Sequence, residues 1–507
     1  MPTPALCAGF GAAFSYYFLF PGFRSGHIGP LALLATLFVP VAVLCLFRVT
    51  ASTPSALGFG AGRGLRAMPT LLSAFAAGMA LGIPAGSSAL SGASFGIPNE
   101  TVTGVSGKLL DDPRLVSGGG SMVTLSLATA YGSEATASAS GELTIFFREG
   151  DAGRLREFGR GAEVFAEGRL QKPAGTFRGF GAEGHVFAAD SLHVTATAGR
   201  LESFRTGIRL GLAERLVGNS AGGNDTAWGG LALALLLGIR DGLDSRLTEL
   251  YRNAGISYIL ALSGMHLAVI IALISFLLKK PLGLRPAAIA GAVVIVAYCF
   301  VVGPLPSLYR SAIMYVLGVL AVLGMLRRDP LSVLAMAFLI QLAVTPKTGF
   351  SLSFVLSYLA MVGILVIGKS LGGILRGSVP RFLLGPLALS LGAFIATAAV
   401  VSRLFGDIRP VGIFAGLVVA PLTSVFMVGS MAWLVLDAVL PAFSPILARV
   451  LSLLYEMMEG TARVAGLLPG VRASPTLVLC VSFVLVVLVV VLDAVARSRR
   501  NRLRPFD

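Results

Sequence analysis

The feature that most constrains this chain is a series of apolar runs, each long enough to cross a lipid bilayer. A span needs about 20 apolar residues, and runs of about 17 to 25 qualify. Hydrophobic residues make up 55% of the 507 positions and charged residues only 13%, whereas a soluble domain is about a quarter charged. The sequence therefore predicts a polytopic α-helical membrane protein with about 12 spans and some interfacial helices. The predicted spans are 4–20, 29–47, 68–85, 255–278, 286–303, 307–326, 331–345, 352–368, 383–404, 411–437, 446–468 and 475–496.

The distribution of Lys and Arg along the chain predicts how these spans are oriented, because cytoplasmic loops collect basic residues. If the basic tail at 497–507 is cytoplasmic, alternation of the spans places sixteen basic residues inside and five in the short outer loops. Both termini are then cytoplasmic, and residues 86–254 lie on the outer side of the inner membrane. Nucleic acid or acidic lipid would also suit the net charge of +15, but this topology accounts for it.

Residues 98–200 change character and predict a soluble all-β domain inserted between the N-terminal helices at 1–97 and the later bundle. Short runs alternate between apolar and polar residues, and Gly- and Ser-rich turns separate them, as in antiparallel strands. The predicted strands are 101–109, 121–129, 141–147, 162–170 and 185–196. Five short strands suit a small barrel, with an OB-like fold as the leading candidate.

The linking segment 201–254 predicts short helices that do not span the membrane. Residues 201–217 form an amphipathic helix suited to the membrane interface. The run 228–238 is too short to span alone, which favours a re-entrant or interfacial hairpin shielded by protein. Residues 243–252 predict a surface helix with Asp244 as its N-cap. The charged residues predicted to lie off the apolar face of the first helix are Glu202, Arg205, Arg209 and Arg215.

Polar residues inside predicted spans mark functional positions, because such residues are costly in a bilayer. The span 255–278 carries Ser263, Gly264 and His266 within four positions. A Ser-Gly pair lets another backbone approach closely or opens the helix locally. His266 then lines a wet cavity or hydrogen-bonds across helices, and a packing histidine bonded to a carbonyl is the alternative.

Arg310 is the second such position, near the outer end of a span that begins after Pro304 and Pro306. Its side chain either snorkels to the interface or points into the bundle, where it could meet a polyanion or a carboxylate. Serines 351, 353 and 357 share a third segment, where serines commonly bond their own backbone or pack closely.

Several chemistries are not supported by the sequence. It contains no GxxxxGK[ST] run for ATP and no HExxH or HxHxDH run for a metal. Ser263 and His266 lack an acid nearby to complete a nucleophilic pair. The four cysteines, which form no metal-binding spacing, lie in apolar runs. We therefore predict no catalytic residue, no metal and no cofactor.

These same segments resemble the ComEC family of DNA-uptake channels. GIRDGLDSRLTELYRNAGISYILALSGMHLAV at 238–269 is similar to the family pattern that ends in AGLSHLLAISGLHV. PSLYRSAIM at 306–314, followed by RRDPLSVLA at 327–335, is similar to PSxxRAxxM and its sequel. TPKTGFSLSFVLSYLAMVGI at 345–364 and GLVVAPLTS at 416–424 match two later blocks. KPAGTFRGFGAEGHVFA at 172–188 is similar to the stretch that closes the family's OB-like domain.

The resemblance implies a passive channel in the bundle 255–496 that carries single-stranded DNA into the cytoplasm. The channel-lining or functional positions that it implies are Ser263, Gly264, His266, Ser307, Arg310 and Ser353. The chain ends at Asp507 without the metallo-β-lactamase-like domain of longer members. We therefore expect separate DNA-delivery, nuclease and cytoplasmic motor proteins as partners, besides membrane lipids, in an assembly whose oligomeric state the sequence does not determine.

The sequence departs from the family pattern at several polar positions. Tyr258 replaces a His, Thr345 an Asp, Ser351 a Gln and Gly416 an Asn. If those groups line the family's pore, conduction by this chain differs from that of its relatives. A secondary transporter of a small anionic solute is the rival hypothesis, since broken helices with intramembrane His and Arg would serve it too.

The charge of the external domain limits where it could bind DNA. Between residues 98 and 200 ten basic and twelve acidic residues give a net charge of −2, so only a local patch at 148–178 suits a polyanion. A barrel that merely docks on the bundle is the alternative. The candidate residues, chosen for stacking and phosphate contact, are Phe147, Arg148, Lys172 and Arg178.

Overall fold

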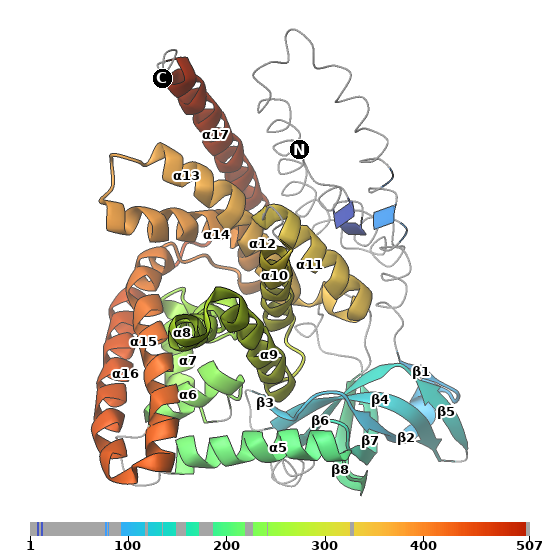
Figure 1. The fold of residues 1–507 in the computed structure, drawn as a ribbon. Helices are drawn as coiled ribbons and strands as arrows, with labels where there is room; N and C mark the ends of the chain where they lie inside the picture. The colour runs from blue at the N-terminus through green and yellow to red at the C-terminus, as the bar shows by residue number, and fades with distance from the viewer. Residues whose placement is uncertain are drawn as a thin grey trace.

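A small β-barrel and a larger bundle of helices lie side by side in the computed structural model, joined by one long helix (Figure 1). The barrel comes first in the sequence and the bundle follows it. The structure describes residues 8–9, 12–13, 73, 77–78, 80, 93–116, 120–133, 135–148, 159–171, 186–218, 227–240, 242–324 and 329–502. The predicted spans 4–20, 29–47 and 68–85 therefore lie almost entirely outside the described residues.

Five strands form the closed barrel, and all five were predicted from the alternation of apolar and polar residues. They are β2 (Val102–Leu109), β4 (Gly120–Gly132), β6 (Glu142–Arg148), β7 (Glu163–Gln171) and β8 (Val186–Ala196). β2 pairs antiparallel with β4 and β7, β4 pairs with β6, and β7 pairs with β8. A parallel pairing of β6 with β8 closes the ring. Shorter strands extend its edge: β1 (Ser94–Phe95), β3 (Arg114–Val116) and β5 (Thr136–Ser140).

The barrel has its own hydrophobic core, to which every strand contributes. Each of the five strands has at least one apolar side chain with no exposed surface, which contributes about 1.5–3 kcal/mol when buried. These side chains are Val105, Leu125, Ile145, Val164 and Phe187. Because successive strand residues point to opposite faces, this core follows from the period-two pattern of the sequence.

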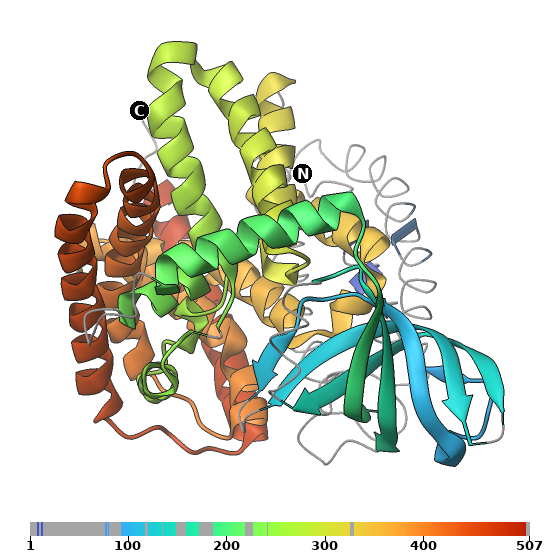
Figure 2. The ribbon, with the colours of Figure 1, turned by 90° about the horizontal axis from the view of Figure 1, so that it is seen from below.

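A long helix connects the barrel to the bundle. α5 (Arg200–Ala213) continues into one turn of π-helix, η3 (Glu214–Gly218), and runs along the base of the bundle (Figures 1 and 2). The predicted helix over 201–217 is confirmed, and Leu201 and Phe204 are mainly exposed on it. Arg205, predicted on the polar side, is instead buried.

Two short helices follow α5, and both have the burial that their sequences predict. α6 (Ala227–Leu237) is apolar on every side, and its residues from Trp228 onward are buried in the bundle core. It is a single helix rather than a hairpin, but its predicted shielding by protein is confirmed. α7 (Ser245–Asn253) begins at the predicted N-cap Asp244, whose carboxylate accepts the Arg246 backbone N–H at 2.8 Å.

The remaining helices form the bundle, packed around two main hydrophobic cores. One core joins α6, α7, α9, α15 and α16, and the other joins α11, α12 and α14. The helices are α8 (Gly264–Leu282), α9 (Leu284–Val302), α10 (Pro306–Leu323), α11 (Pro330–Val344), α12 (Leu352–Val362), η7 (Gly363–Gly368), α13 (Lys369–Ile374), α14 (Arg381–Phe405), α15 (Val411–Val439), α16 (Ser444–Gly466) and α17 (Pro475–Arg502). Short one-turn helices between them are η5 (Ser257–Ile259), η6 (Pro346–Phe350) and η8 (Pro441–Phe443).

Seven helical segments of the described residues are long and apolar enough to cross a membrane, against nine predicted spans that fall within those residues. They are Gly264–Leu282, Leu284–Val302, Pro306–Leu323, Leu352–Ile374, Arg381–Phe405, Val411–Val439 and Pro475–Asp493. The predicted span 331–345 corresponds to α11, which has only 15 residues. The predicted span 446–468 corresponds to α16, whose charged residues, including Glu456 and Glu459, interrupt its apolar surface.

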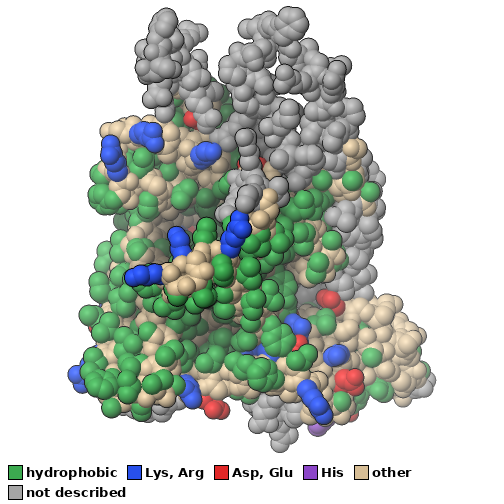
Figure 3. Space-filling view, viewed as in Figure 1, with side chains coloured by type: hydrophobic (Ala, Val, Ile, Leu, Met, Phe, Trp, Pro, Cys, Tyr) green, Lys and Arg blue, Asp and Glu red, His purple; other side chains and the backbone are tan. Residues whose placement is uncertain are grey.

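The surfaces of the two parts differ in the way that a membrane protein with a soluble insertion requires. On the face that Figure 3 shows, hydrophobic side chains cover much of the helical bundle, whereas they are sparse on the barrel. Phe276 and Phe382 on the bundle are 81% and 77% exposed. Apolar surface of this extent is stable in lipid rather than in water.

Candidate functional site

The residues Ser263, Gly264 and His266 form the start of helix α8. Ser263 is the N-cap, and its hydroxyl accepts the backbone N–H of Met265 at 3.3 Å. The Nδ1 atom of His266 accepts the backbone N–H of Ser263 at 3.1 Å and lies 3.0 Å from the Ser263 hydroxyl. The motif is therefore a capping box in which histidine takes the place usually held by Glu or Gln.

This geometry corrects the prediction that residues 255–278 form one continuous span. Residues before Ser263 form a turn and the short helix η5, and Gly255 has a positive φ of 72°. The backbone of Ser263 is extended, with φ −133° and ψ 174°. Ser263 therefore lies just before helix α8 and not within it. Its hydroxyl accepts a backbone N–H of the first helical turn, which is the usual role of serine at the start of a helix.

His266 is fully buried, with no exposed surface. Its Nε2 atom has no hydrogen-bond partner among the described residues. The alternative of a packing histidine whose ring is bonded to a backbone carbonyl is therefore not what the structure shows. One ring nitrogen organises the start of α8, and the other is left facing the interior of the bundle.

Arg310 lies one turn into α10 and points into the bundle rather than toward the interface. Only 6% of its surface is exposed, so the snorkelling alternative is wrong. Its Nε donates to the Ser357 hydroxyl at 2.7 Å, and its Nη2 lies 3.4 Å from the Ser311 hydroxyl. The guanidinium carbon is 5.8 Å from the centre of the Tyr358 ring. Among the described residues no carboxylate forms an ion pair with it.

The start of α8 and the Arg310 guanidinium are neighbours. A Cβ atom on Gly264 would lie 3.4 Å from Arg310 Nη2 and 2.8 Å from the Ser311 hydroxyl, so glycine permits this approach without displacing the Ser311 side chain. The Ser307 hydroxyl, one turn earlier on α10, donates to the backbone carbonyl of Leu262. We call Ser263, Gly264, His266, Ser307, Arg310 and Ser357 the Arg310 cluster.

Gln341 is part of the same polar region, although the sequence pattern did not single it out. It is fully buried on α11. Its Nε2 donates to the Pro306 carbonyl at 2.9 Å, and its Oε1 accepts the Tyr358 hydroxyl at 2.9 Å. A signal was available, because Gln341 is the one polar residue in the apolar run between Ser332 and Thr345. It connects α10, α11 and α12 behind Arg310.

Ser353 is the predicted site residue that lies apart from the cluster. Its side chain is exposed, whereas Ser357, one turn later on α12, contacts Arg310. Ser351 is the N-cap of α12 and accepts the Phe354 backbone N–H at 3.2 Å. Thr345 caps the end of α11 by donating to the Gln341 carbonyl at 3.0 Å. These two departures from the family pattern therefore act as helix caps.

The other two departures, Tyr258 and Gly416, contact each other. A Cβ atom at position 416 would lie 2.2 Å from the Tyr258 hydroxyl oxygen. The large Tyr side chain thus occupies the space that a side chain on α15 would need. The two departures from the family pattern therefore belong together, because the larger side chain at position 258 fills the space that is left by the missing side chain at position 416.

The barrel residues predicted to bind DNA are only partly described. Phe147 is 4% exposed and belongs to the barrel core, so the prediction that it stacks on a base is wrong. The reason is the alternation along β6, which turns Phe147 inward and leaves its half-buried neighbour Phe146 on the other face. The backbone of Arg148 ends β6. Lys172 and Arg178 lie outside the described residues.

A second buried arginine, which the sequence pattern placed on the wrong helix face, joins the barrel to the bundle. Arg205 of α5 is 1% exposed and forms ion pairs with Asp112, just beyond β2, and with Glu202. Its Nε donates to the carbonyl oxygens of Phe300 and Val301, at the end of α9, at 2.9 and 3.1 Å. One guanidinium therefore connects a barrel loop with a bundle helix.

Arg209, one turn further along α5, completes this junction. It donates to the Val302 carbonyl at 2.8 Å and lies 3.5 Å from the Asp112 carboxylate. Positive groups at the end of α9 also complement the negative end of its dipole. We call Asp112, Glu202, Arg205 and Arg209 the Asp112 junction.

The electrostatics of the junction favour its charged form. Burial by itself would raise the pKa of the Asp112 carboxyl. The hydrogen bond from Arg205 and the charges of Arg209 and Arg205 outweigh this effect, so the pKa lies below its usual value of 3.8. Burial would lower the pKa of Arg205, but its bond to Asp112 raises it overall.

Fold and site together define a class of protein: a multi-pass helical membrane protein with an inserted β-barrel and a buried, cationic polar cluster. The chain belongs to the Competence protein family, whose model it matches over residues 235–497, about half of its length. That match contains the whole Arg310 cluster and the helices α8 to α17 up to residue 497.

A curated relative is similar over a shorter region. An uncharacterized protein of Aquifex aeolicus (strain VF5) is 29% identical over 194 residues, which are 38% of this chain and 44% of that relative. The chain thus matches less than half the length of this relative. No solved structure matches the chain.

Proposed function

We propose that this protein is an inner-membrane channel that imports single-stranded DNA during natural transformation. The barrel, which we take to be OB-like, lies on the outer side, and both termini lie in the cytoplasm. Membership of the Competence protein family supports a role in DNA uptake. The observation that carries the proposal of a channel is the buried Arg310 guanidinium, which no described carboxylate neutralises.

An uncompensated buried cation is costly unless an anion meets it during function. The Arg310 guanidinium has five N–H donors, and its described partners are hydroxyls and the weak acceptor Met314 Sδ at 3.9 Å. The adjacent start of α8 adds the positive end of a helix dipole. Two positive groups at one point suit the phosphodiester backbone of a passing strand.

The remaining parts of the machinery are proposed as separate proteins. The sequence contains no ATP motif that would supply a pulling force. We expect a delivery protein outside, a nuclease that leaves one strand, and a cytoplasmic motor. Local patches on the barrel that would contact DNA remain a proposal, with Arg148, Lys172 and Arg178 as its candidates.

The test is a transformation assay in a deletion strain complemented with the wild type, Arg310→Ala or Arg310→Gln. Loss of one charge-assisted contact to each passing phosphate should lower transformation by more than about tenfold, the equivalent of about 1.4 kcal/mol. Arg403→Ala is the matched control, because Arg403 is an exposed arginine at the end of α14 and is not part of the Arg310 cluster.

Two further measurements make the assay decisive. Membrane levels of each variant are compared by immunoblot, so that reduced import is not confused with reduced folding. Uptake of a small anion is measured in the same cells and should not change. If the deletion strain takes up labelled DNA as well as the wild type does, the proposed channel is wrong.

A further inference from the structure

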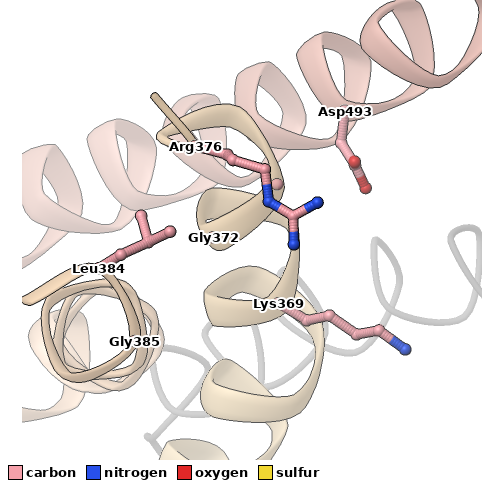
Figure 4. A pocket seen from close by; sticks show the side chains of 7 residues that line it. Lys369, Gly372, Arg376, Leu384, Gly385 and Asp493 are labelled. Carbon is pink, nitrogen blue, oxygen red and sulfur yellow. The ribbon is translucent and has the colours of Figure 1, made fainter. Parts of the chain in front are cut away.

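A cavity lies between α13, α14 and α17, and none of its lining residues belongs to the Arg310 cluster. It has a volume of about 400 Å³. Figure 4 shows Lys369 and Arg376 extending beside α13, with Asp493 of α17 facing the same region. The residues that line it are Lys369, Gly372, Gly373, Arg376, Leu384, Gly385 and Asp493.

One of the two cations and two of the glycines have helical spacing. Lys369, Gly372 and Gly373 stand at i, i+3 and i+4 of α13, the spacing that brings residues to one face, and Arg376 follows two residues after the end of this helix. A Cβ atom on Gly372 would have its nearest neighbour 3.8 Å away, and one on Gly385 would meet nothing within 4 Å. The glycines therefore leave a hollow between two cationic side chains.

Asp493 gives the cavity one acidic wall. Only 7% of its surface is exposed, and its Oδ2 accepts the Ser370 hydroxyl at 2.8 Å. The described lining of the cavity therefore offers two cationic side chains to a phosphate group and one carboxylate to a hydroxyl group.

Apolar surface continues from the cavity along α14. Phe382 and Leu383, next to the lining residue Leu384, are 77% and 36% exposed. Both lie within the span Arg381–Phe405, at its charged end. The cationic side chains of the cavity therefore suit the acidic head of an amphipathic ligand, and the exposed apolar side chains of α14 suit its apolar tail.

We propose that this cavity binds the headgroup of an anionic phospholipid of the phosphatidylglycerol type. The phosphodiester lies between Lys369 and Arg376, a headgroup hydroxyl faces Asp493, and the acyl chains follow Phe382 and Leu383. Basic side chains at the ends of membrane helices attract anionic lipid, and arginine contacts phosphate oxygens in pairs. This inference requires only that the chain is a membrane protein and does not depend on DNA conduction.

The experiment measures lipid retention by native mass spectrometry of the full chain, released from nanodiscs that contain equal phosphatidylglycerol and phosphatidylcholine. The wild type should retain phosphatidylglycerol preferentially. The double variant Lys369→Gln/Arg376→Gln should lower this preference by about tenfold or more, because both basic contacts to the headgroup are lost.

Lys280→Gln/Arg285→Gln is the matched control, since it removes one exposed lysine and one exposed arginine near the ends of other spans. Its preference for phosphatidylglycerol should equal that of the wild type. Gly372→Leu is a second test that keeps both charges but fills the hollow, and it should lower retention as the double variant does. An equal loss in the control, or full retention by Gly372→Leu, would overturn the proposal.

Two competitors distinguish the lipid from other sources of phosphate. Glycerol 3-phosphate and a short single-stranded oligonucleotide are added to the lipid-free protein in detergent, and binding is measured by calorimetry. Neither should bind in a way that depends on Lys369 and Arg376. If either does while phosphatidylglycerol is not retained, the cavity is not a lipid site.

Discussion

Two buried arginines of this protein, Arg205 and Arg310, have opposite electrostatic surroundings. Arg205 joins the barrel to the bundle and is paired with Asp112 and Glu202, and it also donates to backbone carbonyls at the end of α9. Arg310 lies in the bundle beside hydroxyls and an aromatic ring. Similar burial thus occurs in different surroundings: Arg205 is compensated by carboxylates within the fold, whereas Arg310 has no carboxylate partner among the described residues.

The largest expected effect separates the two arginines by stability. Arg205→Met removes the buried cation that pairs with both Asp112 and Glu202, and it leaves these half-buried carboxylates with Arg209 and Arg160 as their remaining partners. The carbonyl oxygens of Phe300 and Val301 also lose their donor, so the free energy of unfolding should fall by about 3 kcal/mol. Thermal unfolding in detergent, followed by tryptophan fluorescence, measures the change. Arg200→Met is the control, since Arg200 is an exposed residue of the same helix and should change stability by less than about 0.5 kcal/mol. Equal losses in both variants would mean that Arg205 carries no structural pair.

Asp112→Asn tests the same junction through pH. The variant should lose about 1–3 kcal/mol near pH 7, because Arg205 and Arg209 lose their shared carboxylate. The folded-state pKa of Asp112 is below 3.8, so this stabilisation is present above that pH and disappears as the pH falls through the folded pKa. Wild type and variant should therefore converge in stability as the pH falls below 3.8.

Unfolding curves from about pH 7 to about pH 2 check this convergence. Asp190→Asn is the control, because Asp190 is exposed on β8 and its substitution should change stability by less than about 0.5 kcal/mol. A stability gap between wild type and Asp112→Asn that stays constant over the whole range would contradict the assigned pKa direction.

Arg310→Met should have the opposite sign to Arg205→Met. Removing a buried cation that has no described carboxylate partner also removes its desolvation penalty, so stability should stay level or rise by about 1–2 kcal/mol. The same unfolding assay measures it beside the transformation assay. A loss of stability as large as that of Arg205→Met would show that Arg310 is neutralised within the fold, and the comparison would fail.

The smallest effect concerns packing near the Arg310 cluster. Gly416→Asn places a side chain against the Tyr258 hydroxyl, which is the movable end of a half-exposed side chain. We expect a loss of about 1 kcal/mol, since overpacking is relieved when a flexible group can shift. Tyr258→His in the same chain should restore stability. Gly318→Asn is a control at a helical glycine with no neighbour within 4 Å.

Much of the fold could be predicted because period and hydrophobicity act locally. The five barrel strands and the cap Asp244 of α7 follow directly from short-range patterns. Two of the nine predicted spans that fall within the described residues lack a helix long and apolar enough to cross a membrane, since α11 has only 15 residues and α16 carries several charges. The site was predicted in part: Arg310 and His266 stood out as ionisable residues in apolar runs. Gln341 and Ser357 could be assigned to the site only from their contacts in the structure, with the Pro306 carbonyl and with Arg310 respectively.

The sequence by itself determined a membrane bundle interrupted by one β-rich domain, because bilayer length and strand alternation are properties of consecutive residues. Only the tertiary structure decided the partners of the charges. Arg205 was expected on a polar helix face and is buried, because Asp112, 93 residues earlier, provides its counter-charge. Arg310 was equally ionisable and found no such partner among the described residues. Electrostatic compensation depends on distance in space, which the order of residues does not state.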